Sequence, residues 1–591
     1  MRSSGVRRSE WRQFRLLSRD ATRRLLNSAL FTRESDSASV ALWLLALLTT
    51  PPLLFAVVRG MSYPFLVRAR PAVVADTVLG DRLFFIVYGM LAALLVASLL
   101  WEALFPDRAE QEIVGVLPVH PRTLAAARLA AAIRIGSIAA VAIAVPAGAV
   151  FTLFSGGHPA LRSIHTLLVG HVVGVTLASL FVFLSLLALR GLMAVTIGTR
   201  AGGWVATALQ LVAIVALADV FLFLPKALDL LIGTLRTGGD AFRLPPLWFV
   251  SLISWLGGDG FDARPELAGL AVIATLCAAL IVTAIYLLSA TGIGRRVMEA
   301  QEHHRRNSLS ELPRAVAAAS TRRPCVRSVF LFTLASLSRS RQHLLILSGY
   351  ASVALAVIVF RVVVAGMHRP RRAGPRLIDA APERLEFAIG QLSSEAPTSA
   401  QLPIPLVLIF FLVLGMRACF RVPTDPAANW PFRLFPPSAR DAARATWLSL
   451  LAIAVAPVAA VTAIAGVVFW SLAAALLAAL TTFFTGVLLI ELALVGWSIV
   501  PFTYSHEPSP DAVRWKWMVG LVALNAFAFG LAPLQASALR SGLGTTWYLL
   551  AMGLAIAAAS IRRCKSIGER EMIFNEAADE TATLSLSEAL N

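Results

Sequence analysis

Long runs of apolar residues recur along the whole chain, and a short polar segment separates each run from the next. A helix needs about 20 mostly apolar residues to cross the hydrocarbon core of a bilayer. Windows of that length predict about twelve such helices. They fall near residues 38–58, 83–104, 127–154, 164–189, 204–224, 266–289, 343–366, 402–420, 445–470, 473–499, 517–536 and 545–561. The pattern therefore predicts an all-α polytopic membrane protein.

The basic residues between the runs predict its orientation. With the N-terminus placed in the cytosol, the cytosolic segments and their edges carry roughly 35 of the 52 Lys and Arg, and the outer loops carry roughly 15. Arg369, Arg371, Arg372 and Arg376, in the outer loop after the seventh run, weaken this asymmetry without reversing it. We therefore expect a multi-pass protein of the cytoplasmic (inner) membrane with both termini in the cytosol.

Two basic segments precede a predicted span. Residues 10–31 place Trp11, Phe14, Leu17 and Leu25 on one helical stripe, with most of the arginines off it. Such a segment is typical of an amphipathic helix that lies in the membrane interface, and the alternative is a solvated basic tail. Residues 326–342 have the same character.

These two segments suggest an internal repeat. Leu117–Arg122 reads LPVHPR, and Phe435–Arg440 reads FPPSAR, each ahead of an Ala/Arg-rich stretch between the second and third span of its half. The predicted halves are 1–300 and 301–561, with six spans each, followed by an acidic cytosolic tail at 562–591. An even number of spans per half predicts two parallel pseudo-repeats related by an axis along the membrane normal.

The loop at 105–126 combines charge with prolines. Pro106 and Asp107 can start a helix, Glu110 three residues later resembles a capping box, and Pro118 stops the helix. A helix of this length is about 15 Å long, which is too short to cross a bilayer. We expect a short cytosolic helix, suited to passing force from a soluble partner; the alternative is a solvated loop. The corresponding loop at 421–444 keeps Asp425 but lacks counterparts of Glu110 and Glu112.

Composition agrees with a membrane protein and excludes several other classes. Of the 591 residues 58% are hydrophobic and 15% are charged, against about a quarter charged in soluble domains. The net charge of +18 is spread over short loops, which favours a topological role over nucleic-acid binding. Four scattered cysteines form no C-x-x-C pair, so neither a disulfide framework nor a metal site is predicted. The Arg-rich start predicts no cleavable signal peptide.

The segment PDRAEQEIVGVLPVHPRTLAAAR, at 106–128, resembles a pattern of the ABC-2 class of ABC-type exporter permeases. LPPLWFVSLISWLGG at 244–258 is similar to the segment before the sixth span, where that family has re-entrant helices. IVPFTYSHEPSP at 499–510 resembles the family's cytosolic loop after the fourth span of the second half. The likeness extends over nearly the whole chain, and its motifs are loose.

The resemblance implies that separate ATPase subunits dock under the two loops and drive alternating access with ATP. The chain lacks a G-x-x-x-x-G-K-[ST] loop, so ATP and magnesium are expected on the partner, with no cofactor, metal or catalytic residue in this chain. The residues implied in coupling are Asp107, Arg108, Glu110, Glu112, Leu117, Pro118, Pro121, Arg122, Asp425, Phe435, Pro436 and Arg440.

Few ionisable residues fall inside the predicted spans, and each is a candidate for the transport path. Glu491 lies well inside the tenth span, where a structural role is the alternative, and Arg134 lies near the inner end of the third. Trp248, Phe249 and Trp255 predict an aromatic belt or, on the exporter interpretation, a lid over the outer exit.

Two other classes of protein stay open. An ion-driven secondary transporter normally has several buried carboxylates or matching broken helices, and the sequence offers a lone Glu491. A membrane glycosyltransferase needs paired carboxylates on an outer loop, where Asp76 and Asp81 stand apart. The hypothesis is therefore an exporter permease that moves an unidentified substrate.

Overall fold

The computed structural model consists of helices joined by turns and loops, and the part of the chain that it describes contains no strand. The described residues are 2–30, 37–66, 70–101, 119–156, 163–196, 205, 208–217, 219, 231–235, 241–258, 264–288, 321–367, 397–399, 401–422, 432, 434–497, 499–503 and 523–568. The chain divides into two compact units, Met1–Asn307 and Ser308–Asn591. Each unit is described by itself.

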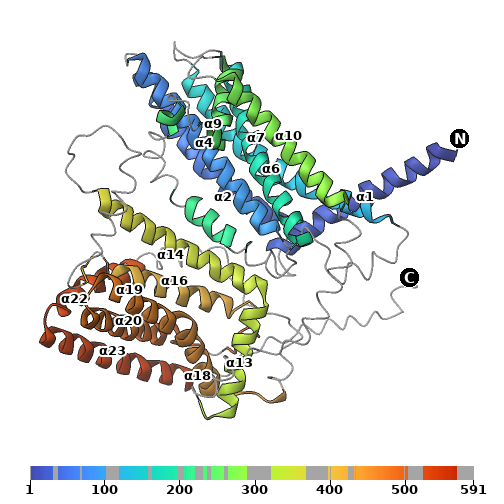
Figure 1. Ribbon diagram of the computed structural model, residues 1–591. Coiled ribbons are helices and arrows are strands. Elements are labelled where there is room, and N and C mark those ends of the chain that lie inside the picture. The colour runs from blue at the N-terminus through green and yellow to red at the C-terminus, as the bar shows by residue number, and fades with distance from the viewer. Residues whose placement is uncertain are drawn as a thin grey trace, which may run out of the picture. The chain divides into compact units, whose positions relative to one another are not determined.

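Unit 1 begins with a long helix followed by two membrane-length helices. Its elements are α1 (Arg2–Leu30), α2 (Ser37–Gly60), α3 (Tyr63–Leu66), α4 (Pro71–Leu100), α6 (Pro121–Ser155), α7 (Ile164–Thr196), η1 (Ala241–Arg243), α9 (Pro245–Gly257) and α10 (Pro265–Leu288). Helix α7 lies at the centre, in contact with α4, α6, α9 and α10, while α1 and α2 both pack on α6 (Figure 1).

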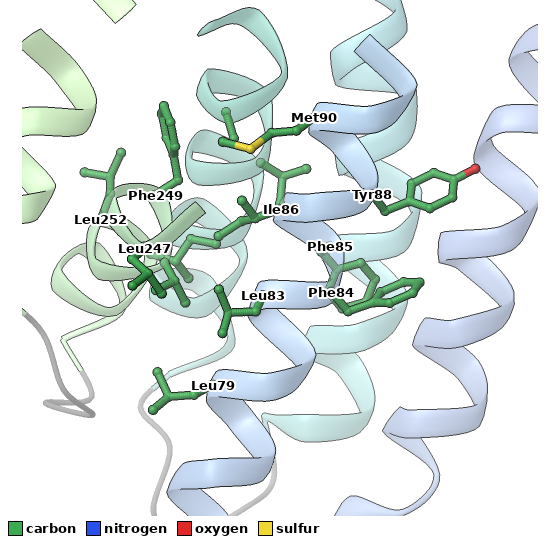
Figure 2. Packing of buried hydrophobic residues seen from close by; sticks show 14 of the residues in the cluster. Leu79, Leu83, Phe84, Phe85, Ile86, Tyr88, Met90, Leu247, Phe249 and Leu252 are labelled. Carbon is green, nitrogen blue, oxygen red and sulfur yellow. The ribbon is translucent and has the colours of Figure 1, made fainter. Parts of the chain in front are cut away.

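Helix α9 is short and buried. Its 13 residues span about 20 Å, so it cannot cross the hydrocarbon core. Gly258 ends the helix with φ 66°, a left-handed conformation that favours glycine. In Figure 2, Leu247, Phe249 and Leu252 of α9 lie on the side of α4 from which Leu79, Leu83 and Ile86 project. Helix α9 is therefore held inside unit 1 by its contacts with α4, α7 and α10.

Two glycines of α7 allow α9 to approach closely. A Cβ atom on Gly170 would lie 3.0 Å from the carbonyl oxygen of Ile253 and 3.2 Å from the backbone nitrogen of Gly257. A Cβ on Gly174 would lie 2.2 Å from Cγ1 of Ile253. Gly170 and Gly174 form a G-x-x-x-G motif, which lets membrane helices pack backbone to backbone.

The opposite face of α4 packs toward α2. The rings of Phe55 and Phe84 stack with centroids 3.7 Å apart, and the hydroxyl of Tyr88 donates a hydrogen bond to the carbonyl of Leu48 at 2.9 Å. Phe84 and Tyr88 accordingly point away from α9 in Figure 2. Helix α4 is therefore covered on both sides.

Unit 2 has its own core around α16. Its elements are α13 (Pro324–Arg339), α14 (Arg341–Met367), α16 (Pro403–Cys419), α18 (Ala439–Leu450), the π-helical turn η3 (Leu451–Val455), α19 (Ala456–Phe469), α20 (Leu472–Ala493), the π-helical turn η4 (Asn525–Gly530), α22 (Leu531–Ala538) and α23 (Gly542–Gly568). Helix α16 contacts α14, α19 and α20, and α23 covers α20 (Figure 1).

The third long helix of unit 2 contains a π turn. Helix α18 continues through η3 into α19 and forms one span, Ala439–Phe469. Pro457 has no N–H to donate, and the wider π turn lies directly before it. The span therefore continues past a proline that would otherwise break its ladder of hydrogen bonds.

Among the described residues, eight helices are long and apolar enough to cross a membrane. They confirm the prediction of an all-helical, polytopic membrane protein. Each of the twelve predicted apolar runs contains described helix, but several of these helices are short, such as α16 with 17 residues. Twelve spans in two parallel repeats stay a prediction. The second predicted span, placed at 83–104, belongs to a helix that begins at Pro71, so Asp76 and Asp81 lie in a helix instead of an outer loop.

Candidate functional site

The two predicted coupling loops are described only at their ends. Residues 102–118 and 423–431 lie outside the described residues, and they include Asp107, Arg108, Glu110, Glu112, Leu117, Pro118 and Asp425. Pro121 and Arg122 begin α6, where the ring nitrogen Nδ1 of His120 accepts a hydrogen bond from the backbone N–H of Arg122 at 3.2 Å. The end of the first loop is therefore fixed as a helix cap.

Helix α1 is fastened to the same part of α6. The guanidinium of Arg134 donates hydrogen bonds to Ser18 Oγ at 3.0 Å and to Thr22 Oγ1 at 3.3 Å. Ser18 and Leu25 are buried on this side, while Trp11 is 59% exposed. Arg134, predicted as a candidate for the transport path, thus lies at the contact between α1 and α6. The contact holds the amphipathic helix to the first half of the third span.

The end of the second loop presents apolar side chains to solvent. The ring of Phe432 packs edge-on against Phe332 of α13 with centroids 5.0 Å apart. Shortly after it, Leu434 is 63% exposed and Phe435 is 82% exposed, and Pro436 is exposed as well. Ser438 then caps α18 by accepting a hydrogen bond from the N–H of Asp441 at 3.1 Å.

An ion pair joins this loop end to α13. Arg323, directly before α13, donates from Nη1 to the carboxylate of Asp441 at 3.2 Å. Solvent screens this exposed pair, so its contribution to stability is small, about 0–1 kcal/mol. The first turns of α13 and α18 nevertheless meet at one place, and we call the exposed residues Leu434, Phe435 and Pro436 beside it the apolar tip.

Glu491 has a partner that the sequence analysis missed. Its carboxylate accepts a hydrogen bond from Nε of Arg563 at 2.6 Å, and the two side chains are 5% and 14% exposed. Glu491 lies near the end of α20 and Arg563 near the end of α23. The pair fastens two helices together, which supports the structural role that was left open for Glu491.

The three aromatic residues at 248–255 differ in exposure. Phe249 is fully buried beside Phe181, and the indole N–H of Trp248 donates to the carbonyl of Phe242 at 3.2 Å. Only Trp255 of the three is exposed, at 57%. Phe249 therefore belongs to the interior of unit 1, and Trp255 is the one that can face lipid.

A buried polar cluster in unit 1 was not predicted. Asp81, 3% exposed, accepts hydrogen bonds from Arg59 Nε at 2.7 Å and from the hydroxyl of Tyr63 at 3.0 Å. The next residue, Arg82, is equally buried and donates to Ser254 Oγ of α9 at 3.0 Å. Two adjacent residues of α4 thus hold α2 and α3 on one side and α9 on the other.

A small cavity lies beside this cluster. It is lined by Tyr63, Val78, Arg82, Phe151, Thr152, Ser155, Leu167, His171 and Ile253. Its free space admits roughly one water molecule. Nε2 of the buried His171 has no hydrogen-bond partner among the described residues, while the hydroxyls of Thr152 and Ser155 donate to carbonyls of their own helix. The small size of the cavity favours a structural role.

We expect Asp81→Asn to destabilise unit 1 by about 2 kcal/mol, because the change removes the charged acceptor of two hydrogen bonds and leaves Arg59 without its counterion. The Arg59 side chain is 37% exposed, so water offsets part of the loss. Thermal unfolding in detergent measures the effect. Asp20→Asn is the control, because it removes the same charge from a solvent-exposed pair with Arg24. Equal shifts for the two variants would contradict the expectation.

Within the described part of the chain, His, Cys, Asp and Glu form no group of three that could hold a metal ion. The described features of the candidate sites are therefore the exposed loop end of unit 2, the helix cap of unit 1, the buried Glu491–Arg563 pair and the part-buried Asp81–Arg59 pair. Comparison of the chain with known protein families, with characterised proteins and with solved structures found no match.

Proposed function

We propose that the protein is the transmembrane permease subunit of an ABC-type exporter, moving an unidentified substrate across the cytoplasmic membrane with ATP hydrolysed by a separate subunit. The observation that carries the proposal is the apolar tip. It is an exposed apolar surface directly before α18, beside the contact between α13 and α18.

The length of that helix supports contact with a soluble partner. Ala439–Phe469 has 31 residues and is about 46 Å long, against a hydrocarbon core of about 30 Å. The polar residues Arg440, Asp441 and Arg444 lie at its beginning, so about 15 Å of helix extends on this side. A tilt of about 20° shortens the helix along the membrane normal by only about 3 Å. Helix α6 has 35 residues, so its length exceeds the thickness of the hydrocarbon core by about 20 Å.

Similar internal contacts in the two units support the proposed repeat. In unit 1 the basic helix α1 packs on α6, and in unit 2 α13 packs on α18. The contacts α4–α7, α7–α10 and α9–α10 have counterparts in α16–α20, α20–α23 and α22–α23. One difference is that α2 packs on α6, whereas α14 packs on α16. On this proposal each unit is a six-span half with its own cytosolic coupling segment.

An ion-driven secondary transporter is the alternative. Such a carrier needs a carboxylate that gains and loses a proton or binds a cation during its cycle. Glu491 and Asp81 are each hydrogen-bonded to an arginine of another helix, which favours a structural role for both carboxylates. Because the sequence has no phosphate-binding loop, the proposed exporter takes its ATPase from another chain.

Co-purification tests the proposal. We expect the tagged protein, extracted from its host in mild detergent, to carry a nucleotide-binding subunit. Replacing Glu110 and Glu112 with Lys should reduce the recovered subunit about tenfold, since two charges in the coupling segment change sign. Glu266→Lys is the control, because Glu266 is exposed in the first turn of α10, at the end of unit 1 where α9 and α10 meet.

If the protein purifies alone and a proton or sodium gradient drives substrate movement in proteoliposomes, the secondary transporter is the correct function.

A further inference from the structure

Two arginines of unit 2 lie over the same aromatic ring. Arg417 belongs to the last turn of α16, and Arg421 follows the end of that helix. The guanidinium carbon Cζ of Arg417 lies 5.9 Å from the centre of the Trp497 ring, and that of Arg421 lies 5.8 Å from the same centre. Both distances are within the range of a cation–π contact. One buried ring therefore brings two positive charges together.

These two charges have no counterion in the part of the chain that the structure describes. Within it, neither guanidinium forms an ion pair or a hydrogen bond, and Nε of Arg421 is buried without an acceptor. The carboxylate of Glu491, at the end of α20, is already hydrogen-bonded to Arg563. Arginine does not lose its proton in a protein, so the two charges repel each other. A buried donor and two like charges at one place favour a bound anion.

A loop after α20 keeps the ring at this place. The backbone N–H of Phe502 donates to the carbonyl of Phe420, directly before Arg421, at 2.9 Å. The indole N–H of Trp497 donates to the carbonyl of Ile499 at 2.7 Å. Phe502 has φ 66°, a left-handed conformation that is unfavourable for a residue other than glycine. Backbone strain of this kind persists where a functional site needs it, which agrees with a binding role for the ring and its two arginines.

The donors at this site fit a phosphate group. A guanidinium is planar, so it can stack on an aromatic face while its N–H groups pair with phosphate oxygens in a bidentate geometry. Arg417 and Arg421 are four residues apart along the chain, so a shared anion must accept hydrogen bonds from two directions. A phosphate group has several oxygens arranged around phosphorus, whereas a carboxylate has two oxygens in one plane. Both arginines are part-exposed, so an anion can reach them from outside the protein.

We propose that Arg417 and Arg421 bind a phosphate group, with Trp497 as the platform that orients both guanidiniums. The phosphate is that of a phospholipid headgroup or of a soluble phosphate compound. Binding neutralises the two like charges and gives Nε of Arg421 an acceptor. The inference does not depend on the proposed exporter function, because it rests on contacts within unit 2 alone.

Thermal unfolding of the purified full chain in a neutral detergent tests the site. The additives are inorganic phosphate, a short-chain phosphatidylglycerol, and a diacylglycerol with the same acyl chains and no phosphate. At about a hundredfold excess over Kd, at least one phosphate compound should raise the unfolding midpoint by about 2 °C. Stabilisation by phosphatidylglycerol alone assigns a lipid headgroup, and stabilisation by inorganic phosphate assigns a soluble ligand.

Two further additives separate binding from general effects. The diacylglycerol, and potassium chloride at the ionic strength of the phosphate sample, should leave the midpoint unchanged. Equal stabilisation by chloride would show that salt merely screens the repulsion between the arginines, and it would overturn the inference. The inference would also be overturned if neither phosphate compound raised the midpoint.

Variants assign the effect to the two arginines. Arg417→Gln with Arg421→Gln should raise the Kd for the stabilising compound at least tenfold by titration calorimetry, because both charged donors are lost. Arg327→Gln with Arg444→Gln is the matched control. It removes the same charge from two exposed arginines of α13 and α18 and should leave Kd unchanged. An unchanged Kd in the Arg417 and Arg421 double variant would overturn the inference.

A conservative variant keeps the test decisive if the double variant does not fold. Arg421→Lys retains the positive charge but replaces the planar fork of donors with a single ammonium group. Its Kd should rise about threefold while its unfolding midpoint without phosphate stays close to that of the unchanged protein. A Kd that ignores this replacement would show that Arg421 does not contact the phosphate.

Discussion

Replacing Glu491 with Gln should lower the free energy of unfolding by about 3–5 kcal/mol, because it leaves the buried guanidinium of Arg563 without a counterion. Both side chains are largely shielded from solvent, at 5% and 14% exposure, so water cannot replace the lost carboxylate. The change also disturbs an ion pair that joins α20 to α23. Thermal unfolding of the purified protein measures the loss, with size-exclusion chromatography used to detect the fraction that stays folded at each temperature.

A double variant distinguishes a structural pair from a functional one. Glu491→Leu with Arg563→Met removes both charges and should recover most of the stability, because replacing a buried ion pair with apolar residues is often neutral or stabilising. If transport also returns in the double variant, the pair is structural. If stability returns and transport stays abolished, Glu491 belongs to the transport path, contrary to our expectation.

Replacing Gly174 with Leu should expel α9 from unit 1. A Cβ at this position would lie 2.2 Å from Cγ1 of Ile253 and 3.5 Å from the carbonyl oxygen of Phe249, so a larger side chain cannot fit without moving the helix. Overpacking of this kind costs about 3 kcal/mol. Because Ser254 of α9 accepts the hydrogen bond from Arg82, displacement of α9 should release the polar cluster at that end of α4.

Cysteine labelling detects the movement. In a cysteine-free background, Ser251→Cys is expected to be inaccessible to a maleimide, because Ser251 is fully buried in α9. Adding Gly174→Leu should expose the thiol and increase its labelling rate. Gly269→Leu on α10 is the control, because a Cβ there meets nothing within 4 Å. Protection of Cys at position 251 in the Gly174 variant would show that α9 tolerates the larger side chain.

Span positions were predictable where the helix and its apolar run coincide. The run predicted at 266–289 appears as α10, Pro265–Leu288, and the run at 473–499 contains α20, Leu472–Ala493. A helix satisfies its own backbone hydrogen bonds within one segment, so local composition is sufficient to find it. The start of α4 was missed because its first turns carry Asp76, Asp81 and Arg82, which a hydropathy window treats as loop.

The candidate sites were predictable only in part. The FPPSAR segment drew attention to Phe435 and Arg440 through its likeness to the first loop, and both are exposed at the end of unit 2. The contacts of Arg323 with Asp441 and of Phe332 with Phe432 could not be predicted, because the partners lie about 100 positions apart in the sequence. For Glu491, the sequence showed a carboxylate inside a predicted span, but it could not identify Arg563 as the counterion, because Arg563 lies on another helix.

The sequence by itself determined the class of the protein, because twelve apolar runs and sparse charge leave few structures other than a helical membrane bundle. It also located the polar segments that precede α6 and α18. Only the tertiary structure decided which charges are paired, how α9 is buried against Gly170 and Gly174, and which side chains of the second loop face solvent. Such contacts join segments that are distant in the chain, and pairing energy depends on geometry that no local pattern contains.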